Sequence, residues 1–251
     1  MSEQINSTLP HQDWISDWFN SYYYHLLYQN RNEAEAHHFL DQLQRLLGFT
    51  TQDEILDLGC GKGRHALYLH RKGFKVIGVD IAENNIKHLL PLQNERLRFI
   101  QHDMREVLQP SYFDYVLSMF TSFGYYDDEA ENLKVLLAIE QSLKKGGKLV
   151  LDYLNPARAL RDMLTLEIKP VGGVNFKIER SMENGVFKKL IKVQDGNKIL
   201  HFEENVKNIA HQDFQRYFTQ ASLTLLSTFG NYNLDEYDPD NSPRMIFVVE
   251  K

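Results

Sequence analysis

The chain has 251 residues, of which 43% are hydrophobic and 25% charged, and its formal net charge is −6. This composition predicts a globular protein with a sizeable core, and the acidic balance argues against nucleic acid as a partner, since phosphate binding normally needs a basic patch. No apolar run reaches the roughly 20 residues of a membrane span, and the first residues lack the pattern of a signal peptide. The single cysteine, Cys60, excludes an internal disulfide and a cysteine-rich zinc site, and the histidines are scattered. We therefore expect a cytoplasmic protein with no membrane partner and no metal.

The N-terminal segment, residues 11–48, is predicted to be helical. Apolar side chains recur there at helical spacing in two stripes, and Gly48 is expected to end the last turn. The first stripe holds Trp14, Trp18, Tyr22 and Leu26, and the second holds Phe39, Leu43 and Leu47.

Strands and helices then alternate as far as Asn155. Short apolar runs predict five strands, and helices are expected between them, including segments 84–90 and 129–143. The strands are expected at 55–58, 76–79, 97–100, 115–117 and 148–151. Apolar strands alternating with helices indicate βαβ units and a parallel sheet that is covered on both faces.

Beyond Asn155 the pattern changes to alternating polar and apolar residues. The turns Asn184-Gly185 and Gly196-Asn197 separate these segments, which predicts antiparallel hairpins over residues 166–206. A helix at about 211–221 and two closing strands, 223–229 and 245–249, complete the chain. In a doubly wound sheet of this kind the ligand binds at the carboxyl ends of the strands, where the strand order switches.

The most specific motif is a glycine-rich run, Gly59-Cys60-Gly61-Lys62-Gly63, between the first strand and the following helix. Such a junction lets a ligand approach bare backbone beside a helix N-terminus. A P-loop would need Ser or Thr after Gly61-Lys62, where Gly63 stands. A dinucleotide fingerprint would need a small residue where Arg64 stands.

The pattern that is present, Asp57-x-Gly59-x-Gly61-x-Gly63, resembles motif I of the class I S-adenosylmethionine-dependent methyltransferases. The resemblance continues in register along residues 54–153. It includes Asp80 at the end of the second strand, His102-Asp103-Met104-Arg105 after the third, Ser118-Met119-Phe120 at the end of the fourth, and Leu143-Lys144-Lys145-Gly146-Gly147 before the fifth. The run Gly63-Arg64-His65 is similar to the tellurite-resistance and sugar-amine members of the small-molecule type.

The resemblance implies a doubly wound, Rossmann-like α/β fold with a seven-stranded sheet, N-terminal helices and an antiparallel β insertion. We expect one domain with four parts: a helical lid (1–48), a cofactor-binding core (49–155), an antiparallel cap (156–208), and a C-terminal helix and hairpin (209–251). The implied cofactor is S-adenosylmethionine.

The resemblance also implies which residues bind this cofactor. Asp57 would reach the ammonium group, Asp80 the ribose and Asp103 the adenine amino group, although Asp57 and Asp103 also fit as caps of backbone N–H groups. The other expected contacts are Gly59, Cys60, Gly61, Gly63, Ile81, Met104, Met119 and Phe120, with Tyr24, Tyr28 and Arg31 from the N-terminal helix. Phe123, Tyr125 and Tyr126 are candidates for the acceptor pocket. Plain packing is the alternative for these aromatic side chains.

The predicted function is in-line methyl transfer to the N or O atom of an unidentified small molecule, by a monomer or homodimer. No catalytic base is identified, and positioning of the acceptor carries most of such a reaction. Ser118-Met119-Phe120-Thr121 stands where DNA amino-methyltransferases carry an Asn/Asp-Pro-Pro tetrad, which argues against that class. Two alternatives stay open: an inactive S-adenosylmethionine-binding regulatory or interaction protein, and a nicotinamide oxidoreductase.

Overall fold

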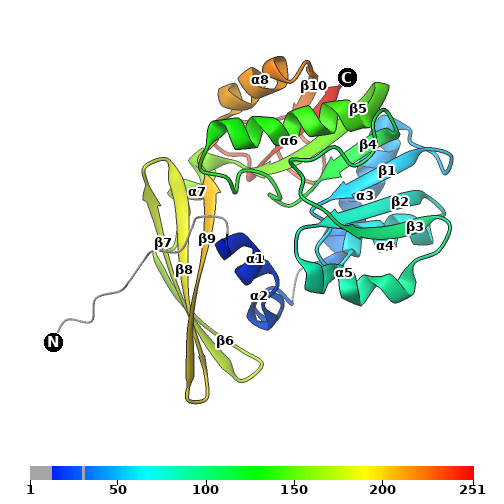
Figure 1. Cartoon of the computed structure of the whole chain (residues 1–251). Coiled ribbons are helices and arrows are strands. Elements are labelled where there is room, and N and C mark those ends of the chain that lie inside the picture. The colour runs from blue at the N-terminus through cyan, green and yellow to red at the C-terminus, as the bar shows by residue number, and fades with distance from the viewer. Residues whose placement is uncertain (1–12, 30–31) are drawn as a thin grey trace.

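The computed structural model describes residues 13–29 and 32–251, and its centre is a seven-stranded sheet in the order β10-β11-β5-β4-β1-β2-β3 (Figure 1). The strands are β1 (Glu54–Leu58), β2 (Lys75–Asp80), β3 (Leu97–Gln101), β4 (Phe113–Ser118), β5 (Leu143–Leu154), β10 (Thr224–Phe229) and β11 (Arg244–Glu250). Strands β1 to β5 run parallel, whereas β11 is antiparallel to both of its neighbours. The predicted fold class is confirmed.

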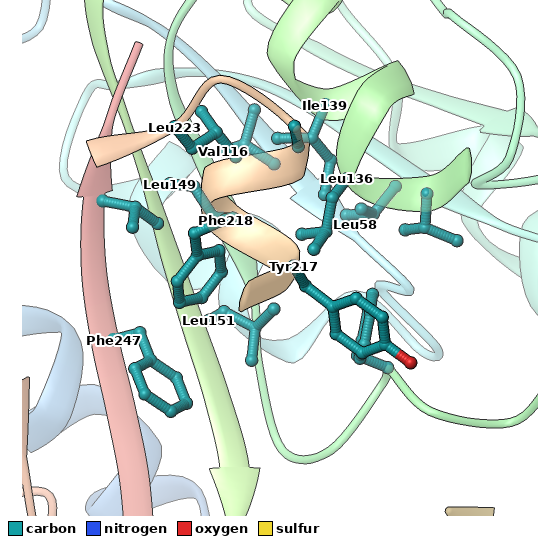
Figure 2. Close-up of a cluster of buried hydrophobic side chains, with 14 of the residues drawn as sticks. Leu58, Val116, Leu136, Ile139, Leu149, Leu151, Tyr217, Phe218, Leu223 and Phe247 are labelled. Atoms are coloured by element: carbon teal, nitrogen blue, oxygen red, sulfur yellow. The ribbon is translucent and has the colours of Figure 1, made fainter. Parts of the chain in front are cut away.

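Helices cover both faces of this sheet, because its strands present apolar side chains to both sides. One face packs against α6 (Glu129–Ser142) and α8 (His211–Gln220), and the other against α3 (Glu33–Leu47), α4 (Arg64–Arg71) and α5 (Glu83–Leu89). Figure 2 shows part of the first layer, with Leu136 of α6 and Phe218 of α8 near Leu149 of β5. Full burial of one such side chain contributes about 1.5–3 kcal/mol.

A second, smaller sheet consists of four antiparallel strands in the order β6-β7-β8-β9. These are β6 (Leu166–Val171), β7 (Val174–Glu183), β8 (Val186–Asp195) and β9 (Lys198–Lys207). The hairpin between β7 and β8 turns at Asn184 and Gly185, whose φ angles are 50° and 77°. This is the left-handed backbone that an Asn-Gly hairpin turn requires.

The N-terminal helices α1 (Asp13–Phe19) and α2 (Tyr22–Leu27) lie between the two sheets (Figure 1). Trp18 and Leu27 pack with Phe176 and Ile191 of the small sheet in one buried cluster. The small sheet and these two helices therefore share a core that is separate from those of the large sheet.

The structure corrects two predictions about the helices. The expected helical segment at the N-terminus is divided into α1, α2 and α3, because Ser21 and Asn32 act as N-caps and accept hydrogen bonds from the backbone N–H groups of Tyr24 and Glu35. Tyr22 consequently leaves the predicted stripe and is 66% exposed. A short helix that was not predicted, α7 (Pro156–Arg161), follows β5.

Three ends of elements also differ from their predictions. Strand β5 is longer than expected, helix α6 ends at Ser142, and a short 3-10 helix, η1 (Leu90–Leu92), follows α5. In the described part of the chain, no helix has the length and apolar character needed to cross a membrane.

Candidate functional site

The glycine-rich turn joins β1 to α4 at the point where the strand order switches, since β1 lies between β2 and β4. Gly59, Gly61 and Gly63 have φ angles of 75°, 55° and 75°, which side-chain-bearing residues rarely adopt. A Cβ at Gly59 would lie 2.8 Å from the Ser122 side chain, whereas one at Gly61 would meet nothing within 4 Å. Gly59 is therefore needed for close packing, and Gly61 leaves bare backbone beside open space.

That open space is a cavity of about 310 Å³ that lies against the glycine turn, the ends of β2 and β4, and the N-terminal helices. Many of the predicted site residues line it together. They are Tyr24, Tyr28, Gly59, Cys60, Gly61, Asp80, Ile81, Met104, Met119, Phe120, Tyr125 and Tyr126. The sequence-predicted residues thus meet in one place, although they come from five separate stretches of the chain.

Asp80 fixes the rim of this cavity. Its carboxylate accepts hydrogen bonds from the backbone N–H groups of Gly61 and Ala82, each at 2.8 Å, and from the Asn85 amide at 3.2 Å. A carboxylate has about four acceptor positions, so these three donors leave capacity for a further donor such as a hydroxyl group. Burial raises the pKa of Asp80 against the lowering effect of these hydrogen bonds.

Asp57 lies beneath the turn and does not line the cavity. It is 1% exposed, and its Oδ2 accepts a hydrogen bond from the backbone N–H of Ala66 at 3.1 Å. Its Oδ1 has no hydrogen-bond partner among the described residues. Burial raises the pKa of this carboxyl to about 7. A buried carboxylate oxygen of this kind is suited to a cationic ligand group, which would supply the missing partner.

Asp103 is held by neighbouring side chains. Its carboxylate pairs with Arg105 at 2.5 Å and accepts a hydrogen bond from the Tyr126 hydroxyl at 3.3 Å. Arg105 also pairs with Glu131 at 2.6 Å. Two of its neighbours, Met104 and Tyr126, line the cavity, whereas Asp103 does not. The expected contact of Asp103 with adenine stays a prediction.

Two further predicted residues, Phe123 and Gly63, do not line the cavity, and a third lies outside the described residues. Phe123 is 1% exposed and packs against Phe214 of α8 with ring centroids 5.6 Å apart, because the chain turns into the core after β4. Gly63 lies against Leu89, which a Cβ would meet at 3.1 Å. Arg31 lies outside the described residues.

An aromatic wall closes the side of the cavity formed by the N-terminal helices. The Phe19 ring lies edge-on to Tyr24 at 4.9 Å and to Tyr125 at 5.3 Å, and Tyr24 lies 5.1 Å from Tyr28. The Tyr28 hydroxyl donates to Glu204 of β9 at 3.0 Å, which ties the wall to the small sheet. The negative faces of such rings favour a positively charged ligand.

Sequence reasoning missed several residues of the cavity wall. They include His25, Glu33, Arg64, His65, Asn85, His102 and Ser122. Arg64 and His65 directly follow the glycine motif, so their position in the sequence was a usable signal. The Arg64 guanidinium lies 4.6 Å from the centre of the Phe120 ring. This contact joins the first residue of α4 to the turn after β4, 56 positions later, and has no local signature.

Comparison with known proteins agrees with this geometry. Residues 55–147 match the family model described as a methyltransferase domain. A Geobacillus sp. (strain WCH70) protein named as a methyltransferase is 26% identical over 224 residues, which cover 85% of this chain and 90% of the relative.

Two solved structures show the same fold. An S-adenosylmethionine-dependent methyltransferase from Clostridium acetobutylicum has a TM-score of 0.75 at 18% identity, over 91% of this chain and 95% of that one. CalS10 from Micromonospora echinaspora, an amino pentose methyltransferase solved with S-adenosylmethionine bound, has a TM-score of 0.64 at 19% identity, over 98% and 99% of the two chains. The predicted resemblance to small-molecule methyltransferases of class I is confirmed, and S-adenosylmethionine is the indicated cofactor.

Proposed function

We propose that this chain transfers a methyl group from S-adenosylmethionine to a nitrogen or oxygen atom of a small molecule. One observation carries the proposal: a single cavity brings together the glycine turn, Asp80 and an aromatic wall. Asp57, two positions before this turn, adds a buried carboxylate oxygen that has no partner among the described residues. These groups match the polar and charged parts of this cofactor.

The residues present fit the cofactor as follows. Gly61 lets backbone approach the methionine part, Gly59 allows the turn to pack on Ser122, and the N-terminus of α4 favours the cofactor's carboxylate. Asp57 supplies an anion for the ammonium group, and Asp80 has acceptor capacity for ribose hydroxyls. When bound, the cofactor supplies an electrophilic methyl group on a sulfonium centre.

The chain's own contribution to the reaction is then binding, orientation and exclusion of water. The aromatic wall, including Tyr24 and Tyr28, would limit the access of water to one side of the cavity. Tyr125 and Tyr126 line the same cavity and stay candidates for contact with the acceptor. We further propose that the small sheet covers the acceptor, since its β9 is bound to the wall through Glu204.

The acceptor class is best sought among small amines. The relationship to an amino pentose methyltransferase supports this choice, and the aromatic lining suits a molecule that gains positive charge as nitrogen is methylated. An amine nitrogen that is already neutral needs no early proton removal, so a general base is not required for the transfer step.

The test is a transfer assay with radiolabelled S-adenosylmethionine and a panel of amino sugars, amino acids and phenols. Incorporation of label into one acceptor, reduced in a Gly61→Ala variant, is the expected result. Binding of S-adenosylhomocysteine without turnover across the panel would contradict the enzyme proposal and favour a regulatory or interaction protein that keeps the cofactor.

A further inference from the structure

The turn that follows β4 has an unusual backbone. Phe120 and Thr121 both lie in the left-handed region, with φ angles of 60° and 61°. The region is unfavourable for residues with a Cβ, and more so for bulky or β-branched ones. Two such residues in succession persist only when the surroundings hold them in place, and such strain tends to occur at functional sites.

A buried carboxylate holds this turn. Asp152 of β5 is 1% exposed, and its Oδ2 accepts hydrogen bonds from the Phe120 backbone N–H at 2.7 Å and the Tyr232 hydroxyl at 3.0 Å. The backbone carbonyl of Asp152 accepts from the Thr121 N–H at 2.9 Å. Asp152 therefore fixes the N–H groups of both strained residues.

Arg244, the first residue of β11, completes the arrangement. Its Nε donates to Asp152 Oδ1 at 2.7 Å, and its Nη2 donates to the Thr121 hydroxyl at 2.9 Å. The ion pair between Arg244 and Asp152 is largely buried, so removing one partner would leave the other as an unpaired buried charge, which is destabilising.

The held turn forms part of the cavity wall. Met119, Phe120 and Ser122 all line the cavity, while Asp152 does not. Ser122 packs on Gly59 of the glycine turn, and the Phe120 ring lies beneath the guanidinium of Arg64. A change in the backbone at Phe120 and Thr121 would displace these contacts with the glycine turn.

We propose that Asp152 is a positioning residue: fixed by Arg244 and Tyr232, it holds the backbone of the Phe120-Thr121 turn in the left-handed conformation that shapes the cofactor cavity. The inference rests on the proposed function, because it takes S-adenosylmethionine as the ligand of that cavity. Asp152 acts through backbone geometry and does not touch the cofactor.

The test is calorimetric titration with S-adenosylhomocysteine. Asp152→Asn removes the charge that Arg244 pairs with, and we expect binding about tenfold weaker than in the wild-type protein. Glycine adopts a positive φ readily, so Thr121→Gly lets position 121 keep its conformation without the hydrogen bonds that Asp152 organises. The double variant Asp152→Asn/Thr121→Gly is therefore expected to recover most of the lost affinity, which a general loss of packing would not allow.

Asp114→Asn is the matched control. Like Asp152, Asp114 pairs with a cationic side chain, that of Lys144 at 2.6 Å, and accepts a hydrogen bond from a backbone N–H, that of Glu54 at 2.9 Å. Unlike the turn that Asp152 holds, the residues paired with Asp114 do not line the cavity. We expect this variant to bind as the wild type does. If Asp152→Asn does not fold, Tyr232→Phe is the substitute, because it removes one hydrogen bond to Asp152 and keeps the ion pair with Arg244. We expect this variant to lose less affinity for S-adenosylhomocysteine, and Thr121→Gly to recover that affinity as well.

Two results would overturn the inference about Asp152 and leave the proposed function intact. The first is wild-type affinity for S-adenosylhomocysteine in both Asp152→Asn and Tyr232→Phe. The second is a loss of affinity in these two variants that adding Thr121→Gly does not reverse in either. Absence of S-adenosylhomocysteine binding in the wild-type protein would instead overturn the proposed function, and this inference with it.

Discussion

We expect Asp57 to make the binding of S-adenosylhomocysteine dependent on pH. Its pKa in the folded protein is about 7, against an ordinary value of 3.8, because burial disfavours the charged form. The folded protein therefore holds this proton more tightly than the unfolded chain does. The resulting contribution to stability is complete below pH 3.8 and is lost as the pH rises to about 7. Its size is about 4 kcal/mol, from roughly 1.4 kcal/mol for each unit of pKa.

The ammonium group of S-adenosylhomocysteine would be attracted to Asp57 only when the Asp57 carboxyl group is ionised. With a pKa of about 7, only about a tenth of the unliganded protein is ionised at pH 6, and about nine tenths at pH 8. S-adenosylhomocysteine is therefore expected to bind about tenfold more weakly at pH 6 than at pH 8.

Asp57→Asn separates this effect from the histidines that line the cavity. The amide keeps the shape of the side chain and does not titrate, so the variant is expected to bind S-adenosylhomocysteine more weakly at pH 8 and to lose the Asp57 part of the pH dependence. The assay is calorimetric titration from pH 6 to 8 at constant ionic strength. An affinity that does not change with pH in the wild-type protein, or an equal pH dependence in the variant, would refute this reasoning.

Other substitutions test the remaining parts of the site. Asp80→Ala is expected to weaken S-adenosylhomocysteine binding by roughly 1–3 kcal/mol, because hydrogen bonds to a charged acceptor are lost; unchanged affinity in calorimetry would remove Asp80 from the site. Gly61→Ala places a methyl group beside the open space next to its backbone, so urea denaturation should show a loss of only about 1–2 kcal/mol while binding falls at least about tenfold; full affinity would contradict backbone contact here. Phe123→Ala is expected to cost about 3–5 kcal/mol of stability, measured in the same way, because this side chain packs in the core against Phe214; a loss under about 1 kcal/mol would place Phe123 outside the core.

The parallel part of the fold was predictable because its signals are local. Apolar runs of strand length alternate with helical segments between Glu54 and Leu154, and each strand appears within a few residues of its predicted place. The hairpins of the small sheet were predictable from Asn184-Gly185 and from alternating side chains. The ends of β5 and the break between α1 and α2 were not, since they depend on pairing with β11 and on capping by Ser21.

In the candidate site, too, the residues that could be predicted are those with a local sequence signature. Asp80 and Gly61 were found because a strand end and a glycine turn have sequence signatures. The Asp103 carboxylate pairs with Arg105 two positions later. Arg105 is visible in the sequence, but only the structure shows that it contacts the carboxylate expected to bind adenine. Asp152 and Arg244 were not identified, because they meet across 92 positions and only the pairing of β5 with β11 brings them together.

The most direct test of the account is calorimetric titration of the whole chain with S-adenosylhomocysteine, with NAD in a parallel experiment. We expect S-adenosylhomocysteine to bind with an affinity in the micromolar range, about −8 kcal/mol, and NAD not to bind. Binding of NAD alone would contradict the interpretation of the glycine turn, and binding of neither ligand would contradict the assignment of this cavity to the cofactor.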